Sequence, residues 1–321
     1  MKKVILYILC AALMMSLLGC ARVNTSAKGS ENGISIVTTI FPLYDFARAV
    51  TDGKADVTML IDPGAEVHTF DPTPDDMIKI QNADVFIYIG GENEAWVDQV
   101  LESMDTSGKT ILRLMDAVTP VEEEVVEGMQ SDHAHPDEED EHAHEHEFDE
   151  HIWTSPKNAM LMVSAIAEAM GKADETNAEA YNKNAADYNA QIGEVDKRIQ
   201  GIVDNASRKL ILVADRFPFR YMVDEFGLDY SAAFSGCSAE SDVSVGTLTY
   251  LIDKVKAESI PYIYYIELSN KRVAESVAEQ TGVNMLLLHS CHNVTKSDFD
   301  AGVTYVKLMQ QNADNLEKGL N

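Results

Sequence analysis

The sequence has little positive charge. It contains 25 lysine and arginine residues against 53 aspartate and glutamate residues, which gives a net charge of −28. A surface of this sign repels phosphate backbones and attracts cations, which argues against nucleic-acid binding. Aromatic residues are also few, at 7%, but 45% of the 321 residues are hydrophobic. The chain is therefore long and apolar enough to fold as two lobes, each with its own core.

Long apolar runs are scarce, and the one at the N-terminus is too short to span a membrane. Two lysines precede an apolar run of about 15 residues, Val4 to Leu18, whereas a membrane helix needs about 20. Residues 1–19 are therefore predicted to be a secretory signal peptide. The sequence Leu17-Leu18-Gly19-Cys20 resembles the bacterial lipobox, which implies lipidation of Cys20 and a lipid anchor in the membrane.

Cysteine is rare as well. Of the four cysteines, Cys10 lies in the predicted signal peptide and Cys20 in the lipobox, which leaves Cys237 and Cys291. Two cysteines in an exported domain commonly form a disulfide. They can equally be free thiols or soft metal ligands, and the sequence leaves these alternatives open because it does not give their separation.

Short apolar runs alternate with helical patterns in two parts of the chain. Strands are expected at Ile34–Thr38, Val57–Ile61, Asp84–Ile89, Thr110–Leu114, Leu210–Ala214, Tyr230–Phe234, Tyr262–Glu267 and Met285–His289. Helices are expected at Leu43–Val50, Pro74–Ala83, Glu94–Met104, Phe219–Phe226, Thr247–Glu258, Lys271–Thr281 and Asp298–Lys318. Strands that alternate with helices indicate parallel α/β sheets, so two α/β lobes are predicted.

A helical connector is predicted between the two lobes. Ser155-Pro156 begins a helix, and from Glu175 to Val203 apolar residues recur at alternating spacings of three and four. At 1.5 Å per residue the second helix is about 42 Å long, so it is expected to lie along both lobes and restrain their hinging. The predicted organisation is a signal peptide at 1–19, a tether at 20–33, an N-terminal lobe at 34–155, a helical connector at 156–205 and a C-terminal lobe at 206–321.

More than half of the histidines lie in one short acidic segment, residues 131–147. They are His133, His135, His142, His144 and His146. Histidine alternating with acid cannot form an apolar core, so a surface loop is predicted. Imidazole and carboxylate groups suit Zn²⁺ and neighbouring ions, which favours weak secondary metal binding over the alternative of a merely solvated acidic loop.

The remaining histidines are His68, His151, His289 and His292. His68 follows the second expected strand, and His289 ends the last one. Ligands of parallel α/β lobes gather at the carboxyl ends of strands. An isolated histidine is more often a surface or core residue, but this placement makes the group a candidate for one metal site between the lobes.

Several of these motifs together resemble a known family. They are Cys20, Ile40-Phe41-Pro42, Gly64-Ala65-Glu66-Val67-His68-Thr69-Phe70-Asp71-Pro72, Gln81-Asn82-Ala83-Asp84, the His-rich segment, Asp149-Glu150-His151-Ile152-Trp153-Thr154-Ser155-Pro156, Tyr305, Asn312 and Leu316. Over essentially its whole length the sequence resembles the zinc- and manganese-binding lipoproteins of bacterial ABC importers. The resemblance implies two α/β lobes joined by one long rigid helix, with a metal site in the cleft between them.

The resemblance also implies the ligands. It assigns His68 and His151 directly, and it places a fourth ligand at His289, where imidazole favours zinc over manganese. The family's third ligand falls at Arg216, whose guanidinium has no lone pair to donate. Glu240 is the first choice to replace it, and the alternatives are Asp215, Cys237, His292 and Glu267. Either Asp215 or Glu240 is expected to neutralise Arg216.

The expected function is that of a receptor and not an enzyme. The chain has neither the HExxH motif of zinc hydrolases nor the nucleophile elbow of serine hydrolases. We expect an extracytoplasmic, lipid-anchored, monomeric receptor that delivers a divalent ion, zinc or alternatively manganese, to an ABC permease and its ATPase. Neutral imidazoles are required, so binding should weaken below about pH 6.5. A surface adhesin or metal-buffering lipoprotein is the alternative.

Overall fold

The computed structural model describes residues 33–130, 148–238 and 242–321. The predicted signal peptide, nearly all of the tether, the His-rich segment 131–147 and Glu240 lie outside the described residues. Within the described part, no helix combines the length and hydrophobicity that crossing a membrane requires.

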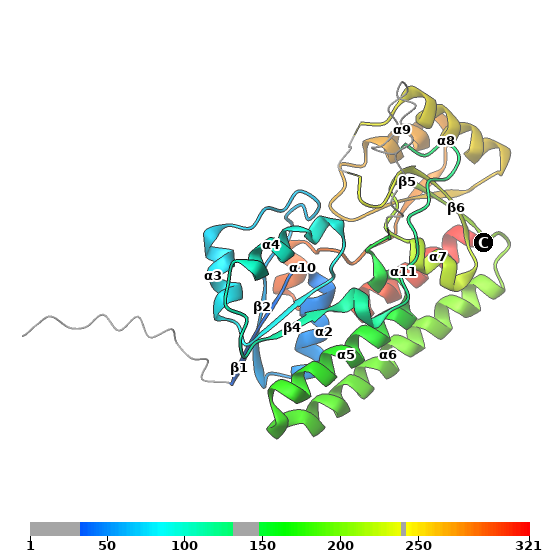
Figure 1. Cartoon of the computed structure of the whole chain (residues 1–321). Helices are drawn as coiled ribbons and strands as arrows, with labels where there is room; N and C mark the ends of the chain where they lie inside the picture. The colour runs from blue at the N-terminus through cyan, green and yellow to red at the C-terminus, as the bar shows by residue number, and fades with distance from the viewer. Residues whose placement is uncertain (1–32, 131–147, 239–241) are drawn as a thin grey trace, which may run out of the picture.

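Two four-stranded parallel sheets form the centres of two α/β lobes (Figure 1). The first has the order β2-β1-β3-β4, from β1 (Ile34–Thr38), β2 (Ala55–Met59), β3 (Val85–Tyr88) and β4 (Thr110–Arg113). The second has the order β6-β5-β7-β8, from β5 (Leu210–Arg216), β6 (Asp229–Phe234), β7 (Tyr262–Tyr265) and β8 (Asn284–Leu287). All eight expected strands are present, and the predicted fold class is confirmed.

Helices cover these sheets, which explains the continuous apolar runs of central strands such as β3, buried along its whole length. They are α2 (Phe41–Thr51), α3 (Pro74–Asn82), α4 (Trp96–Glu102), α7 (Arg220–Phe226), α8 (Val245–Ala257) and α9 (Arg272–Thr281). Short 3₁₀ turns are η1 (Glu92–Glu94), η2 (Leu114–Ala117), η3 (Ile152–Thr154) and η4 (Glu175–Asn177). The sequence fixes some ends locally: Thr73 and Asp76 form a capping box at the start of α3.

The connector is a pair of helices packed side by side, α5 (Pro156–Ala173) and α6 (Ala178–Asp204) (Figure 1). The predicted apolar stripe of α6, which includes Tyr181, Tyr188 and Ile199, is buried. At 27 residues α6 is about 40 Å long, and it packs against α2 in the first lobe and against α7 in the second. The prediction of a long helix along both lobes is therefore confirmed.

The last predicted helix, Asp298–Lys318, is in fact two helices. They are α10 (Lys296–Asp300) and α11 (Tyr305–Leu320), separated at Gly302, whose φ of 70° suits glycine. Phe299 of α10 packs against Tyr44 of α2, with ring centroids 5.0 Å apart. The end of the chain is therefore shared between the lobes, which the helical periodicity alone did not show.

Glu94 is a buried carboxyl group beside the cleft end of β3. Its Oε2 accepts hydrogen bonds from the backbone N–H groups of Ile89 (2.7 Å) and Gly90 (2.8 Å). Burial raises its pKa to about 7, although these hydrogen bonds oppose the shift. In the unfolded chain the pKa of glutamate is about 4.3, so the unfolded state loses this proton first and stability falls as pH rises from about 4.5 to 7.

Glu94→Gln is therefore expected to remove this pH dependence. The neutral amide keeps the carbonyl acceptor, and above pH 7.5 the variant should be more stable than the wild type by about 3 kcal/mol. Urea unfolding of both proteins at pH 5 and pH 8 measures the effect. The free energies of unfolding of the wild type and the variant should be closer to each other at pH 5 than at pH 8. If the free energy of unfolding changed equally with pH in both proteins, Glu94 would not be the group that causes the pH dependence.

Candidate metal centre

Three histidines meet where the two lobes face each other. His68 follows β2, His151 precedes η3 and His292 follows β8. Their nearest ligand nitrogens lie within 4.8 Å of one another. The ring centroids are 5.9 Å apart for His68 and His151, 5.0 Å for His68 and His292, and 5.3 Å for His151 and His292. These three residues, the histidine cluster, can converge on one ion.

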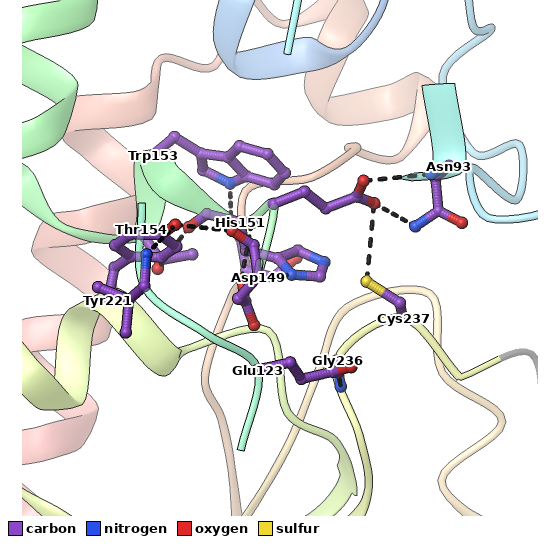
Figure 2. A network of polar contacts seen from close by, with 12 residues as sticks. Asn93, Glu123, Asp149, His151, Trp153, Thr154, Tyr221, Gly236 and Cys237 are labelled. Carbon is purple, nitrogen blue, oxygen red and sulfur yellow. Dashed lines mark hydrogen bonds and ion pairs between the residues drawn. The ribbon is translucent and has the colours of Figure 1, made fainter. Parts of the chain in front are cut away.

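His151 is fully buried and is fixed by its neighbour Asp149 (Figure 2). The Asp149 Oδ1 atom accepts the backbone N–H of His151 (2.8 Å) and lies 3.1 Å from its Nδ1. Nε2 of His151 has no hydrogen-bond partner within the described residues. A buried nitrogen without a partner, on a ring whose other nitrogen is held by a carboxylate, is the arrangement of a metal-binding histidine.

The other two rings are held in the neutral form. Burial, together with His151 and Arg216, lowers the pKa of His68 to about 3. Burial also lowers the pKa of His292 well below its usual range, and His68 and His151 add to the effect. Burial disfavours the charge of His151 too, but the surrounding carboxylates, Asp149 first, outweigh it and raise its pKa. Two of the three rings thus keep free lone pairs at neutral pH and well below it.

The structure brings His292, and not His289, into the cluster. His289 lies in a separate hollow against α11, where its Nδ1 accepts the backbone N–H of Cys291 (2.9 Å). Cys291 has a φ of 62°, in the left-handed region, so the chain reverses between the two histidines. The ring of His292 then packs on Trp153, with centroids 4.8 Å apart. Glu267 holds this turn by accepting the backbone N–H of Ser290 (2.7 Å).

The two cysteines are free thiols, so the disulfide alternative does not describe this structure. Cys291 is buried beside the backbone oxygen of His289. Cys237 lies at the cleft, and its Sγ donates to Oε1 of Glu150 at 3.7 Å. Sequence reasoning weighed Cys237 as a ligand but missed Glu150, although its position next to His151 was a usable signal.

Comparison with known proteins identifies the family. Residues 36–319 match the family model described as zinc-uptake complex component A, periplasmic. The chain belongs to this family. The high-affinity zinc uptake system protein ZnuA of Bacillus subtilis is 30% identical over 314 residues, which cover 97% of this chain and 95% of that protein. The zinc-binding protein AdcA of Streptococcus pyogenes is 31% identical over 98% of this chain, which spans 61% of its length.

Solved structures of the same kind share the fold. The metal-dependent lipoprotein YcdH of Bacillus subtilis has a TM-score of 0.75 and 27% identity, over 90% of this chain and 100% of that one. The Zn(II)-bound ZnuA-like domain of Streptococcus pneumoniae AdcA has a TM-score of 0.73 and 27% identity, over 89% and 98%. The laminin-binding protein Lbp of Streptococcus pyogenes, at 22% identity, shows a likeness of fold alone.

The family resemblance led us to expect a metal ligand at the position of Arg216. Its guanidinium pairs with Glu66 of the opposite lobe, at 3.3 Å from Nη1 to Oε1 and 3.2 Å from Nη2 to Oε2. We expected Asp215 or Glu240 to neutralise Arg216. Asp215 does not take this role, because its Oδ1 accepts the backbone N–H of Arg216 instead (2.9 Å). Arg216 and Glu66 both line two hollows of about 200 Å³ in the cleft.

Proposed function

We propose that this protein is an extracytoplasmic receptor that binds one Zn²⁺ in the cleft and delivers it to the permease and ATPase of an ABC importer. The observation that carries the proposal is the histidine cluster, in which His68, His151 and His292 come from three separate segments and meet between the lobes. Membership in the zinc-uptake family supports the same cargo. The chain is proposed to act as a monomer, anchored through lipid on Cys20.

The donor set supports zinc over manganese. Three imidazoles match the nitrogen ligands of tetrahedral zinc sites, whereas manganese sites are richer in carboxylate and water oxygens. The neutral state of His68 and His292 means that these two rings need not lose a proton before they bind an ion. We therefore propose that Zn²⁺ is the transported ion.

The surroundings of the cluster support binding without catalysis. A catalytic zinc site needs a carboxylate or similar base that is free to act on a bound water. The carboxylate of Glu150, the residue before His151, is engaged by the backbone N–H of Asn93 (3.2 Å), by the Asn93 amide and by the Cys237 thiol. These hydrogen bonds leave it poorly placed to act as a base on a bound water, and we propose that the site binds and releases the ion unchanged.

The pair Arg216 and Glu66 is proposed to hold the two lobes together over the ion. Arg216 ends β5 in the second lobe, and Glu66 lies two residues before His68 in the first. Because α6 packs along both lobes, closure is expected to be a small adjustment at the cleft and not a wide hinge motion.

Zinc analysis of the full chain and of a variant with all five histidines of segment 131–147 changed to serine tests this function. The variant should keep one tightly bound Zn²⁺ and lose only weaker equivalents, because the three cleft histidines already converge, whereas the segment is expected to bind only weakly. Elemental analysis after dialysis, with calorimetry against a competing chelator, measures both. A variant without any tight Zn²⁺ would place the receptor site in the segment and refute the cleft assignment.

A further inference from the structure

A second group of donors adjoins the histidine cluster. Ligand atoms of Glu150, His151 and Cys237 also lie within 4.8 Å of one another. We refer to these three residues as the thiol set. His151 belongs to both groups, whereas Glu150 and Cys237 are not part of the histidine cluster. The thiol set therefore lies to one side of His151 as a donor group of its own.

Glu150 and the loop that carries Cys237 are both held in place by close contacts with neighbouring residues. A side chain at Gly91 would collide with the Glu150 carboxylate, and Asn93 donates to that carboxylate from both its backbone and its amide (Figure 2). On the other side, Gly236 lets the loop before Cys237 approach the ring of His151: a Cβ at Gly236 would lie 3.1 Å from Cε1 of His151. The loop is further fixed because Gly236 donates its backbone N–H to Glu123 (3.0 Å).

His151 supplies the independent sign that an ion belongs here. Its side chain is fully buried, Asp149 holds Nδ1, and Nε2 has no hydrogen-bond partner within the described residues. One nitrogen with one free lone pair serves one ion at a time. Binding to the histidine cluster and to the thiol set should therefore be mutually exclusive.

We propose that Glu150, His151 and Cys237 form a second metal site for a thiophilic divalent ion, which alternates with the histidine cluster through their shared ligand His151. The inference rests on the proposed function, since it gives the same cargo a second position in the cleft. A thiolate, an imidazole and a carboxylate are an accepted donor set for Zn²⁺, and the sulfur favours softer ions such as Cd²⁺. The ion replaces the thiol proton of Cys237, which is released to solvent.

Cobalt(II) provides the test, because a bound thiolate gives Co²⁺ an intense near-ultraviolet charge-transfer band that imidazole ligands do not give. The test starts from the variant in which the five histidines of segment 131–147 are serine. Adding His292→Ala to it disables the histidine cluster but spares the thiol set, and one equivalent of Co²⁺ should then bind and show this band. Adding Cys237→Ser should abolish the band and the bound equivalent. Adding Cys291→Ser instead should leave both unchanged, and this matched comparison cancels any contribution from Cys10 and Cys20.

The outcomes separate this inference from the proposed function. Bound Co²⁺ without the band in His292→Ala, no Co²⁺ binding in that variant, or loss of the band with Cys291→Ser would each overturn the thiol set. The single variant Cys237→Ser keeps the histidine cluster and should still bind one Zn²⁺ tightly. If Cys237→Ser bound no Zn²⁺ while His292→Ala still bound a metal ion, the thiol set would be supported as a metal site and the histidine cluster would be refuted.

Discussion

Replacing His68 or His292 with alanine is expected to weaken Zn²⁺ binding by about 100-fold or more, while His289→Ala leaves it near the wild-type value. A structural zinc site contributes about 10–16 kcal/mol of apparent binding energy, so the loss of one of three imidazoles removes several kcal/mol. His289 is not expected to matter because it lies in a separate hollow against α11, away from the point where His68, His151 and His292 converge. Calorimetry with chelator competition measures the affinities.

The His289→Ala variant is also the control for this experiment, because it lies three residues from His292 in the same turn. Circular dichroism should show that all three variants keep the wild-type fold, since the core lies mainly in the sheets and the connector helices. A large loss in His289→Ala together with an unchanged His292→Ala would reverse the assignment and restore the ligand implied by the family resemblance.

Asp149→Asn is expected to weaken Zn²⁺ binding by about 10- to 100-fold while all three histidines remain. Removing the carboxylate that holds a ligating ring typically has an effect of this size. Asp149 accepts from both the backbone and Nδ1 of His151, so it fixes the ring and keeps Nε2 available as the donor. An amide at this position can present its NH₂ group to Nδ1 and favour the other tautomer.

Glu123→Gln is the matched control for Asp149→Asn. Glu123 is a nearby acid that raises the pKa of His151, but its hydrogen bond goes to the backbone of Gly236. If general negative charge were the important property, both variants should weaken Zn²⁺ binding equally. If the positioning of the His151 ring is important, only Asp149→Asn should weaken Zn²⁺ binding. Zinc affinities of the two variants at one pH and ionic strength decide between these explanations.

The lobes and their connector could be predicted from the sequence because their signals are local. Ile34–Thr38 was predicted with the bounds that the structure shows, and the stripe from Tyr181 to Ile199 fixed one face of α6. Such patterns depend on the periodicity of each segment and on which face must be buried, and neither needs knowledge of distant residues. The break at Gly302 was missed because a single glycine is compatible with a helix until packing decides.

The sequence by itself also determined that His68 and His151 are candidate ligands, because each lies in a motif next to a recognisable strand or helix boundary. Only the tertiary structure shows that His292, and not His289, lies beside His68 and His151, with the left-handed residue Cys291 between the two histidines. The pairing of Arg216 with Glu66 is also visible only in the tertiary structure, because the two residues are 150 positions apart in the chain. Contacts of this kind depend on how two separately folded sheets face each other, and no local pattern in either partner encodes that geometry.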